Sequence, residues 1–272
     1  MTKEFGDHTI DNPYPESSAG HGAPPGPLPS SIAGFRILGK LGEGGMGVVY
    51  EAEQQEPRRI VALKVIRGGA AVDEAQVRMF QREVETLARL KHPDIGGIYA
   101  SGRTPEGLHW FAMELVPGQD LGAFLAARPK IVTPDELRLR LRLIARIAGA
   151  VHYAHQRGVI HRDLKPSNII VTEGRSSASG VLAGVPEVKI LDFGLAHITD
   201  DDLHIAETLT VAGALKGTLP YMSPEQARGQ ADAIDVRTDV YALGVVTYEL
   251  LTGKRPYDVM RASLLEAVRV IC

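Results

Sequence analysis

The sequence predicts an α+β fold in which a β-rich first part precedes a mainly helical second part. Between residues 35 and 115, short runs rich in β-branched and aromatic residues are separated by glycine-containing turns, a pattern typical of strands. After Pro117 and Gly118, which form a natural hinge, apolar residues recur at helical spacing over long stretches. Residues 1–34 are rich in proline, glycine and serine and lack a periodic apolar pattern, so we expect a disordered leader there.

Composition and charge narrow the function classes. The chain has 272 residues, of which 44% are hydrophobic and 23% charged, as is ordinary for a soluble globular protein. Its net charge of −3 gives no indication of a surface for nucleic acid or membranes. Cys272 is the single cysteine, which excludes a disulfide framework within the chain. We find no signal-peptide pattern and no apolar run of membrane-spanning length. We therefore expect a cytoplasmic chain, or the cytosolic part of a longer and possibly membrane-anchored protein.

A glycine-rich turn joins the first two predicted strands. Its glycines are Gly42, Gly44 and Gly47, and the second strand is predicted over residues 48–53. Without Cβ atoms, such a turn brings backbone N–H groups close to phosphate oxygens. A dinucleotide-binding fold needs a helix directly after its glycines, and a P-loop needs a Gly-Lys-Ser/Thr triplet, but the sequence has neither. The strand-turn-strand pattern therefore favours a glycine flap that closes over a nucleotide.

Lys64 lies among apolar residues in the strand predicted over residues 60–66. A lysine at a sheet edge commonly extends its ammonium group into solvent, and this is one interpretation. The alternative is that Lys64 holds nucleotide phosphates and is oriented by a carboxylate from the following helix. The apolar spacing in that helix places Glu83 beside the apolar face and the competing Glu85 on the more polar side, which favours Glu83. Two further strands are predicted over residues 95–101 and 108–115.

A long helix is predicted to start after Thr133 and to end near residue 156. Leucine and arginine alternate over residues 137–143, which taken alone would indicate a strand. Thr133 and Glu136, however, form the pattern of a capping box at a helix N-terminus. The apolar residues that follow recur at helical spacing: Leu137, Leu141, Ile144, Ala148 and Val151. We interpret the histidines of this helix, His152 and His155, as packed or solvated rather than as metal ligands.

Residues 161–168 read His-Arg-Asp-Leu-Lys-Pro-Ser-Asn and combine several kinds of polar chemistry. Asp163 is an acceptor-only carboxylate, Lys165 carries a positive charge and Asn168 offers a neutral oxygen ligand. Such a loop can orient a hydroxyl nucleophile, neutralise an anionic leaving group and hold a hard metal ion. A polar turn between a helix and a strand is the alternative, and it would be favoured for a shorter cluster.

A second carboxylate motif follows a short strand predicted over residues 188–191. In Asp192-Phe193-Gly194 a carboxylate stands at a strand end before a glycine, which suits a ligand of Mg²⁺ on substrate phosphates. A simple turn is the alternative. A serine-rich insertion over residues 172–184 precedes this strand, and a long polar segment follows it. Beyond Ser-Pro-Glu at residues 223–225, an apolar helix is predicted over residues 235–251 and an amphipathic helix over residues 263–272.

Taken together and in this order, the motifs resemble the signature set of eukaryotic-type serine/threonine protein kinases. The residue sequence of the octet and the proline-rich leader are similar to those of the bacterial members. The matching motifs are Gly42/Gly44/Gly47/Val49, Val61-Ala62-Leu63-Lys64, Glu83, His161-Arg162-Asp163 with Lys165 and Asn168, Asp192-Phe193-Gly194, and Ser223-Pro224-Glu225. The resemblance implies a bilobal protein-kinase-like fold. A small antiparallel β lobe with one helix is expected over residues 35–116, and a larger, mainly helical lobe over residues 117–272. The implied activity is transfer of the γ-phosphoryl group of Mg·ATP to serine or threonine hydroxyls of proteins.

The resemblance also implies a role for each matched position. Asp163 would accept the substrate hydroxyl proton, and Lys165, Asn168 and Lys64 complete the implied catalytic set. Asn168 and Asp192 would hold Mg²⁺. The implied ATP-binding residues are Leu41, Gly42, Gly44, Gly47, Val49, Ala62, Lys64, Glu83, Met113, Glu114 and Val116. Autophosphorylation is expected on the activation loop, whose implied threonines are Thr208, Thr210 and Thr218, with Arg162 as the partner of a phosphate there. The implied partners are ATP and protein substrates, and no nucleic acid.

The chain also departs from the family pattern. Kinase domains continue beyond the position of Cys272, and one of their later helices carries an arginine that pairs with the Glu225 position. We therefore expect a fragment whose large lobe lacks its final helices. Two other functions remain open: a pseudokinase, and a kinase of small molecules. The presence of Lys64, Asp163 and Asp192 argues against the first, and the Gly-Thr…Pro-Glu pattern over residues 217–225 argues against the second.

Overall fold

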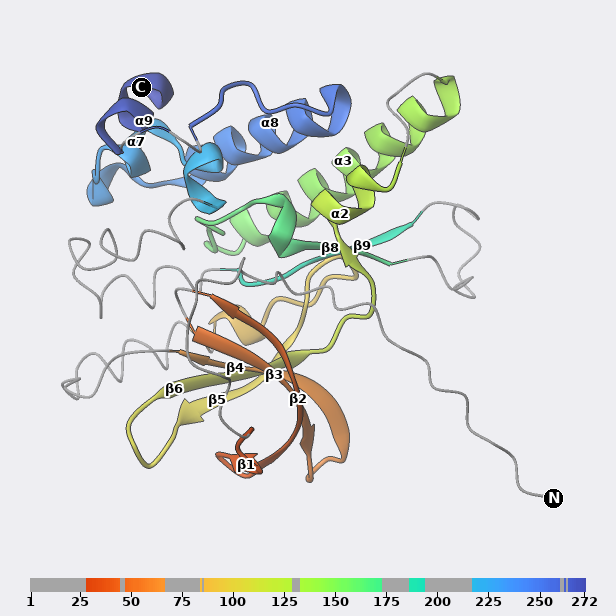
Figure 1. Ribbon diagram of the computed structural model, residues 1–272, viewed down its shortest axis with the longest axis vertical. Helices are drawn as coiled ribbons and strands as arrows, with labels where there is room; N and C mark the ends of the chain where they lie inside the picture. The colour runs from red at the N-terminus through yellow and green to blue at the C-terminus, as the bar shows by residue number, and fades with distance from the viewer. Residues whose placement is uncertain are drawn as a thin grey trace.

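The computed structural model describes residues 28–44, 47–66, 84, 86–128, 133–172, 186–193, 217–259, 262 and 264–272. A six-stranded sheet lies at one end of the molecule and helices lie at the other, with a three-stranded sheet between them (Figure 1). The strands are β1 (Ser31–Ile32), β2 (Phe35–Gly44), β3 (Gly47–Gln54), β4 (Arg59–Ile66), β5 (Ile98–Arg103), β6 (His109–Glu114), β7 (Gln119–Asp120), β8 (Ile169–Thr172) and β9 (Glu187–Ile190). The α-helices are α2 (Leu121–Ala126), α3 (Pro134–His155), α7 (Pro224–Ala227), α8 (Val236–Thr252) and α9 (Leu264–Ile271), and short 3₁₀ turns are η1 (Pro166–Asn168), η2 (Leu219–Tyr221) and η3 (Ala231–Ala233).

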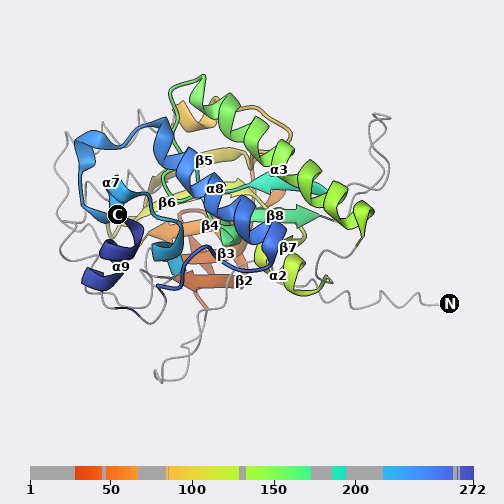
Figure 2. The same cartoon turned by 90° about the horizontal axis from the view of Figure 1, so that it is seen from above.

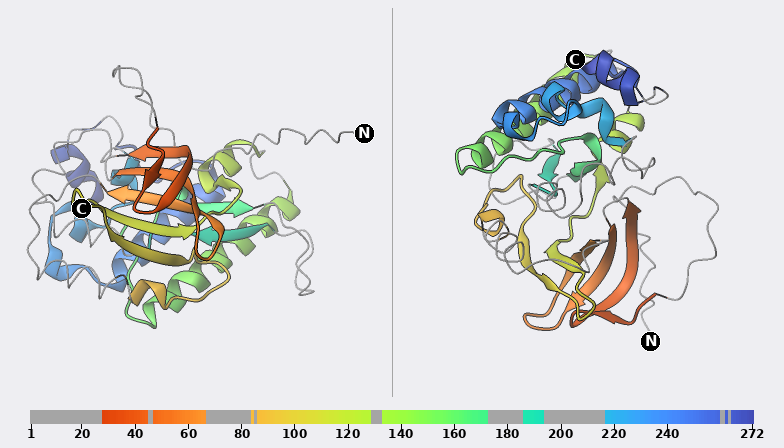
Figure 3. Two further views of the ribbon diagram at one scale, coloured as in Figure 1. Left: turned by 90° about the horizontal axis from the view of Figure 1, so that it is seen from below. Right: turned by 90° about the vertical axis from the view of Figure 1, so that its left-hand side faces the viewer.

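The six-stranded sheet forms a small lobe, set apart from a large lobe that holds the other sheet and the helices (Figure 3). Its strands follow the order β1-β2-β3-β4-β6-β5, and all neighbouring strands are antiparallel. Strand β4 lies between β3 and β6, and all its residues from Val61 to Ile66 are buried. This burial on both faces explains the apolar run around Lys64. The predicted bilobal α+β architecture is confirmed.

The first strand corrects the expected extent of the leader. Ser31 and Ile32 pair with Arg36 and Phe35 of β2, although they fall within the stretch expected to be disordered. The two-residue turn between these strands has positive φ at both positions, Ala33 (49°) and Gly34 (84°), the geometry that closes a tight hairpin. Turn geometry of this kind leaves little trace in the sequence when alanine occupies the first position. Residues 1–27 lie outside the described residues.

Gly47 starts β3 at a point where the sheet leaves no room for a side chain. Its φ is 156°, and a Cβ atom placed there would lie 2.1 Å from the main-chain oxygen of Val65 on β4. No real side chain tolerates such a contact with backbone. At Gly44, on the other side of the turn, a Cβ atom would have no described neighbour within 4 Å.

Helices α3 and α8 run side by side over the three-stranded sheet of the large lobe (Figure 2). Helix α3 begins as predicted, because the side-chain oxygen of Thr133 accepts a hydrogen bond from the N–H of Glu136. Helix α8 is capped by Asp235 and ends at Gly253, which has the left-handed conformation (φ 69°). The predicted existence of both helices is therefore confirmed.

The buried face of α3, however, differs from the predicted one. Leu137 and Leu141, which we assigned to the apolar face, are 39% and 48% exposed. The buried face instead includes Glu136 and Arg140, joined by an ion pair of 2.9 Å between Arg140 Nε and Glu136 Oε1. Arg140 also donates from Nη1 to the main-chain oxygen of Leu250 on α8 (2.6 Å). Burial of charged side chains is tolerated here because each finds a partner, and a pattern that counts only apolar residues misses it.

Other elements also differ from the prediction in detail. Strand β5 starts at Ile98 rather than at residue 95, since Gly96 donates its N–H to Ile190 of β9 instead of pairing within the small lobe. Neither β7 nor α2 was predicted. The helix expected before residue 90 is described at Val84 and residues 86–88, which are helical. The serine-rich insertion lies outside the described residues, apart from Thr172. No helix within the described parts of the chain is long and apolar enough to cross a lipid bilayer.

Candidate active site

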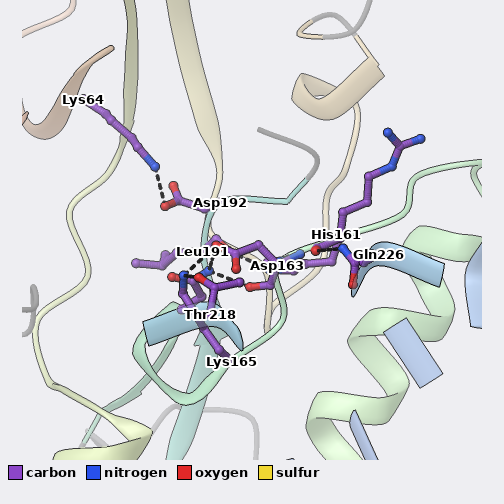
Figure 4. A network of polar contacts seen from close by, with 10 residues as sticks. Lys64, His161, Asp163, Lys165, Leu191, Asp192, Thr218 and Gln226 are labelled. Carbon is purple, nitrogen blue, oxygen red and sulfur yellow. Dashed lines mark hydrogen bonds and ion pairs between the residues drawn. The ribbon is translucent and has the colours of Figure 1, made fainter. Parts of the chain in front are cut away.

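The octet over residues 161–168 connects α3 to β8 and brings its polar side chains together (Figure 4). Asn168 donates from Nδ2 to the main-chain oxygen of Asp163 (2.7 Å) and to its carboxylate Oδ2 (3.2 Å). Lys165 Nζ lies 2.8 Å from the same Oδ2. These contacts hold the Asp163 carboxylate in one orientation, with cationic and neutral donors on one oxygen.

The surroundings of Asp163 favour the ionised form of its carboxyl group. Its burial raises the pKa of the carboxyl group, but the charge and the hydrogen bond of Lys165 outweigh this effect and hold the pKa below the usual range. Its other oxygen, Oδ1, is buried and has no hydrogen-bond partner within the described part of the chain. An ionised carboxylate with an oriented acceptor is what general-base catalysis on a hydroxyl group requires.

Lys165 links the octet to the segment that carries Thr218. Its ammonium group donates to the hydroxyl oxygen of Thr218 (2.8 Å) while it also contacts Asp163. Thr218 immediately precedes η2, and Gln226 of α7 donates to the main-chain oxygen of Arg162 (2.6 Å). Two hydrogen bonds therefore attach the segment over residues 217–227 to the octet and keep this segment next to Asp163.

Lys64 and Asp192 meet between the lobes. The ammonium group of Lys64 on β4 lies 2.6 Å from Asp192 Oδ2, which follows β9 (Figure 4). The Lys64 side chain is 9% exposed and the Asp192 side chain 24% exposed. A lysine that only extended into solvent at a sheet edge would not be this buried, so that interpretation of Lys64 is wrong. Glu83, the expected partner of Lys64, and Glu85 lie outside the described residues.

Asp192 adopts a backbone conformation that is unusual for a residue other than glycine, with φ of 60°. His161 supports the main chain next to Asp192. The His161 ring donates from Nε2 to the main-chain oxygen of Leu191 (2.9 Å) and accepts the N–H of Asp163 at Nδ1 (3.3 Å). These two bonds assign the proton of a neutral ring to Nε2. The ring also packs against Phe193, with centroids 4.6 Å apart. His161 thus connects the main chain of Asp163 with the main chain just before Asp192.

Asp239 is a site residue that our sequence reasoning missed. It lies on α8, is fully buried, and accepts the main-chain N–H of His161 at Oδ2 and that of Arg162 at Oδ1, both at 2.8 Å. Arg162 has a φ of 66°, so this carboxylate holds a strained backbone next to Asp163. Asp239 is the fifth residue of the apolar helix predicted over residues 235–251, and a charged residue inside that apolar pattern was the available signal.

Asn168 and Asp192 offer an amide and a carboxylate, the oxygen ligands that Mg²⁺ accepts together with phosphates and water. The Lys64 ammonium group already occupies a position against the Asp192 carboxylate, which shows that this carboxylate accommodates a cation. The amide nitrogen of Asn168 points to Asp163, which directs its oxygen elsewhere. The donor set therefore fits a hard divalent cation.

The apolar residues expected to contact a nucleotide base belong to, or pack against, one core cluster. Ala62, Met113 and Val116 are buried, and Leu41 and Val49 pack against the same core cluster. Met113 also lines a small cavity together with Asp192 and Phe193. Glu114, at the end of β6, accepts at Oε2 from Lys189 Nζ of β9 (2.9 Å) and from the N–H of Gly97 (3.2 Å). Gly42 and Gly44 lie in β2, on the strand that leads into the glycine turn.

Three of the expected residues, Thr208, Thr210 and Gly194, lie outside the described residues. Glu225, for which we expected a missing arginine partner, accepts a hydrogen bond from the Thr238 hydroxyl (2.6 Å). Burial raises the pKa of Glu225, but this hydrogen bond contributes to a net lowering.

Comparisons with known proteins agree with this geometry. The protein kinase domain profile matches residues 35–269. Serine/threonine-protein kinase pkn3 of Myxococcus xanthus is 42% identical over 226 residues, which cover 82% of this chain and 38% of the relative. Serine/threonine-protein kinase PknB of Mycobacterium tuberculosis is 38% identical over 233 residues, which cover 84% of this chain and 34% of the relative. The chain thus spans little more than a third of the length of these relatives.

A solved structure shows the same fold. The PknI kinase domain of Mycobacterium tuberculosis superposes with a TM-score of 0.61 at 32% identity, covering 85% of this chain and 80% of that chain. The motifs in sequence order, their convergence between two lobes and the profile match over most of the chain lead to one conclusion. This chain belongs to the protein kinase domain family.

Proposed function

We propose that the chain is a protein serine/threonine kinase that transfers the γ-phosphoryl group of Mg·ATP to protein hydroxyls. The arrangement around Asp163 carries this proposal. Its ionised carboxylate is oriented by Asn168 and contacts Lys165, which also donates a hydrogen bond to Thr218. In this assignment Asp163 orients the acceptor hydroxyl and takes its proton. Lys165 stays close enough to neutralise charge on the transferred group.

ATP would lie between the lobes, under the glycine turn. Ala62 and Met113 would contact the base, and the main chain at Glu114 and Val116 would bond its edge. Lys64 would move from Asp192 to the phosphates, because a metal ion at Asp192 competes for the same carboxylate oxygen. Asn168 and Asp192 would hold Mg²⁺, which screens the negative charge of the phosphates when bound.

The identity of the family supports Ser/Thr specificity, since relatives named serine/threonine-protein kinases share 42% and 38% identity with this chain. We include autophosphorylation on Thr208 or Thr210 in the proposal, with Arg162 as the phosphate partner. The proposed location is the cytoplasm, as a separate protein or as the cytosolic part of a membrane-anchored one; the single cysteine agrees with a reducing compartment.

Transfer from γ-labelled ATP tests the proposal. The 272-residue chain is incubated with Mg²⁺ and a general protein substrate, and the labelled residues are identified by mass spectrometry. Label on serine or threonine, lost in Asp163→Asn, is the expected result. Nucleotide binding without any transfer would identify a pseudokinase, and label on small molecules alone would identify a different phosphotransferase. Either of these outcomes rejects the proposal.

A further inference from the structure

The side-chain amide of Gln226 on α7 bonds two separate parts of the main chain. Its Nε2 donates to the main-chain oxygen of Arg162 in the octet (2.6 Å), beside which Gln226 lies in Figure 4. Its Oε1 accepts the main-chain N–H of Ser223 (3.1 Å), which completes the capping box at the start of α7. A carbonyl group only accepts and a backbone N–H only donates, so both partners impose the same orientation on the amide.

The bond to the octet holds the peptide group that directly precedes the catalytic carboxylate. The oxygen of Arg162 belongs to the peptide that joins Arg162 to Asp163. The N–H of the same peptide donates to His161 Nδ1 at 3.3 Å, so the bond from Gln226 is the shorter of the two. Arg162 has a φ of 66°, and a non-glycine residue keeps such a conformation only while its surroundings enforce it. Rotation of this peptide would redirect the Asp163 side chain, because the peptide is attached at its Cα atom.

Helix α7 is itself anchored, so its amide group holds the octet from a fixed position. Glu225, the residue before Gln226, accepts a hydrogen bond from the Thr238 hydroxyl of α8 (2.6 Å). The segment over residues 217–227 is also bonded to the octet at its other end, through Thr218. The position of this segment is therefore transmitted to the main chain of the octet at two points.

We propose that Gln226 is a positioning residue for phosphoryl transfer, which couples the segment over residues 217–227 to the base Asp163 by holding the Arg162–Asp163 peptide. Within the described part of the chain, the Gln226 side chain forms no hydrogen bond with a residue assigned to the nucleotide or the metal ion. Its removal therefore lowers kcat and leaves nucleotide affinity nearly unchanged. The catalytic part of this inference rests on the proposed kinase activity, but the contact with the octet does not.

Three substitutions of similar length separate the two bonds of the amide. At pH 8 the carboxylate of Gln226→Glu only accepts, so it keeps the bond to Ser223 and loses the bond to Arg162. Glutamate is also a usual partner in a capping box, so α7 should keep its N-terminal cap. Gln226→Lys keeps a donor and loses the acceptor, and Gln226→Met has neither. The Glu and Lys variants change the charge in opposite directions while the Met variant leaves it neutral, so an effect of charge alone would give a different order.

We expect Gln226→Glu and Gln226→Met to lower kcat about 10-fold to 100-fold, as small displacements of catalytic groups do. The KM for ATP should stay within about twofold of that of the unchanged chain, and Gln226→Lys should retain most of kcat. Gln156 is exposed and bonded to His152, and it provides the control Gln156→Glu, for which no change is expected. Full activity of Gln226→Glu together with a loss in the Met and Lys variants would show that only the cap matters, and it overturns the inference.

Amide hydrogen exchange measures the contact without relying on activity. In Gln226→Glu and Gln226→Met, the N–H of Asp163 should exchange at least about 10-fold faster than in the unchanged chain, because its peptide is no longer held at the oxygen. In Gln226→Lys and Gln156→Glu it should stay protected. Unchanged exchange in Gln226→Met overturns the inference. If the unchanged chain transfers no phosphate, the proposed function fails, and hydrogen exchange at Asp163 still decides whether Gln226 holds the octet.

Discussion

The buried ion pair on α3 yields a quantitative prediction about stability. Arg140→Met removes a guanidinium group that is 3% exposed and that bonds both Glu136 and the main-chain oxygen of Leu250. Breaking a buried ion pair from one side costs about 3–5 kcal/mol of unfolding free energy. Arg128 still pairs with Glu136 at 3.2 Å, so we expect the lower end of this range, about 3 kcal/mol.

Thermal unfolding followed by circular dichroism measures this loss. For a chain of this size, about 3 kcal/mol corresponds to a melting temperature lower by roughly 6–12 °C. The matched control is Arg138→Met on the same helix, where the pair with Asp135 is 66% and 91% exposed and no measurable loss is expected. The double variant Glu136→Leu/Arg140→Met should melt above the single Arg140 variant, since it also removes the buried carboxylate that would otherwise keep only the partly exposed Arg128 as its ion-pair partner. Equal melting temperatures for Arg140→Met and Arg138→Met would refute the reasoning, because they would show that the buried pair contributes nothing.

The remaining predictions concern the site itself. Asp163→Asn should retain nucleotide binding and lower turnover by roughly 10²–10⁴-fold, the usual contribution of a general base; full activity would remove Asp163 from this role. Because the pKa of Asp163 lies below its ordinary 3.8, the carboxylate stays ionised between about pH 6 and 8 and its function is lost only as the pH falls through the lowered pKa; a rate profile in which this carboxylate titrates near neutrality would contradict this. Asp192→Ala should weaken Mg²⁺-dependent nucleotide binding more than Asn168→Ala, because it removes a charged ligand; titrations with and without Mg²⁺ that show equal losses would reject the order. Phosphopeptide mapping after incubation with ATP should find phosphate on Thr208 or Thr210, and full activity of the double alanine variant would count against a regulatory role.

The sequence alone predicted those structural features that are determined by residues close together in the chain. The cap at Thr133 overrode a misleading leucine-arginine alternation, and α3 formed as predicted. The short motifs, each read from a few neighbouring residues, and their order along the chain were also sufficient to predict the two lobes. Both kinds of signal are visible in a single chain.

The signals that failed depend on residues far apart in the chain. The buried face of α3 is decided by Arg140 reaching Leu250 of α8, 110 positions away. Asp239 lies 78 positions from His161, and nothing near it in the sequence indicates that its carboxylate accepts backbone N–H groups of the octet. Charged residues inside apolar helix patterns are the class to examine first, because burial forces them to find partners.

The glycines of the motif over residues 42–47 are needed for different reasons. At Gly47 the reason is the tight contact with β4 described above. A side chain at this position would collide with the oxygen of Val65 inside the sheet, whether or not a nucleotide is present. Gly44 meets no such obstacle from the described residues. A library that varies both positions should therefore lose folded protein at position 47 even with alanine, while substitutions at position 44 yield folded protein whose nucleotide affinity varies. Part of a motif that is read as a phosphate-binding signature is thus a requirement of strand packing.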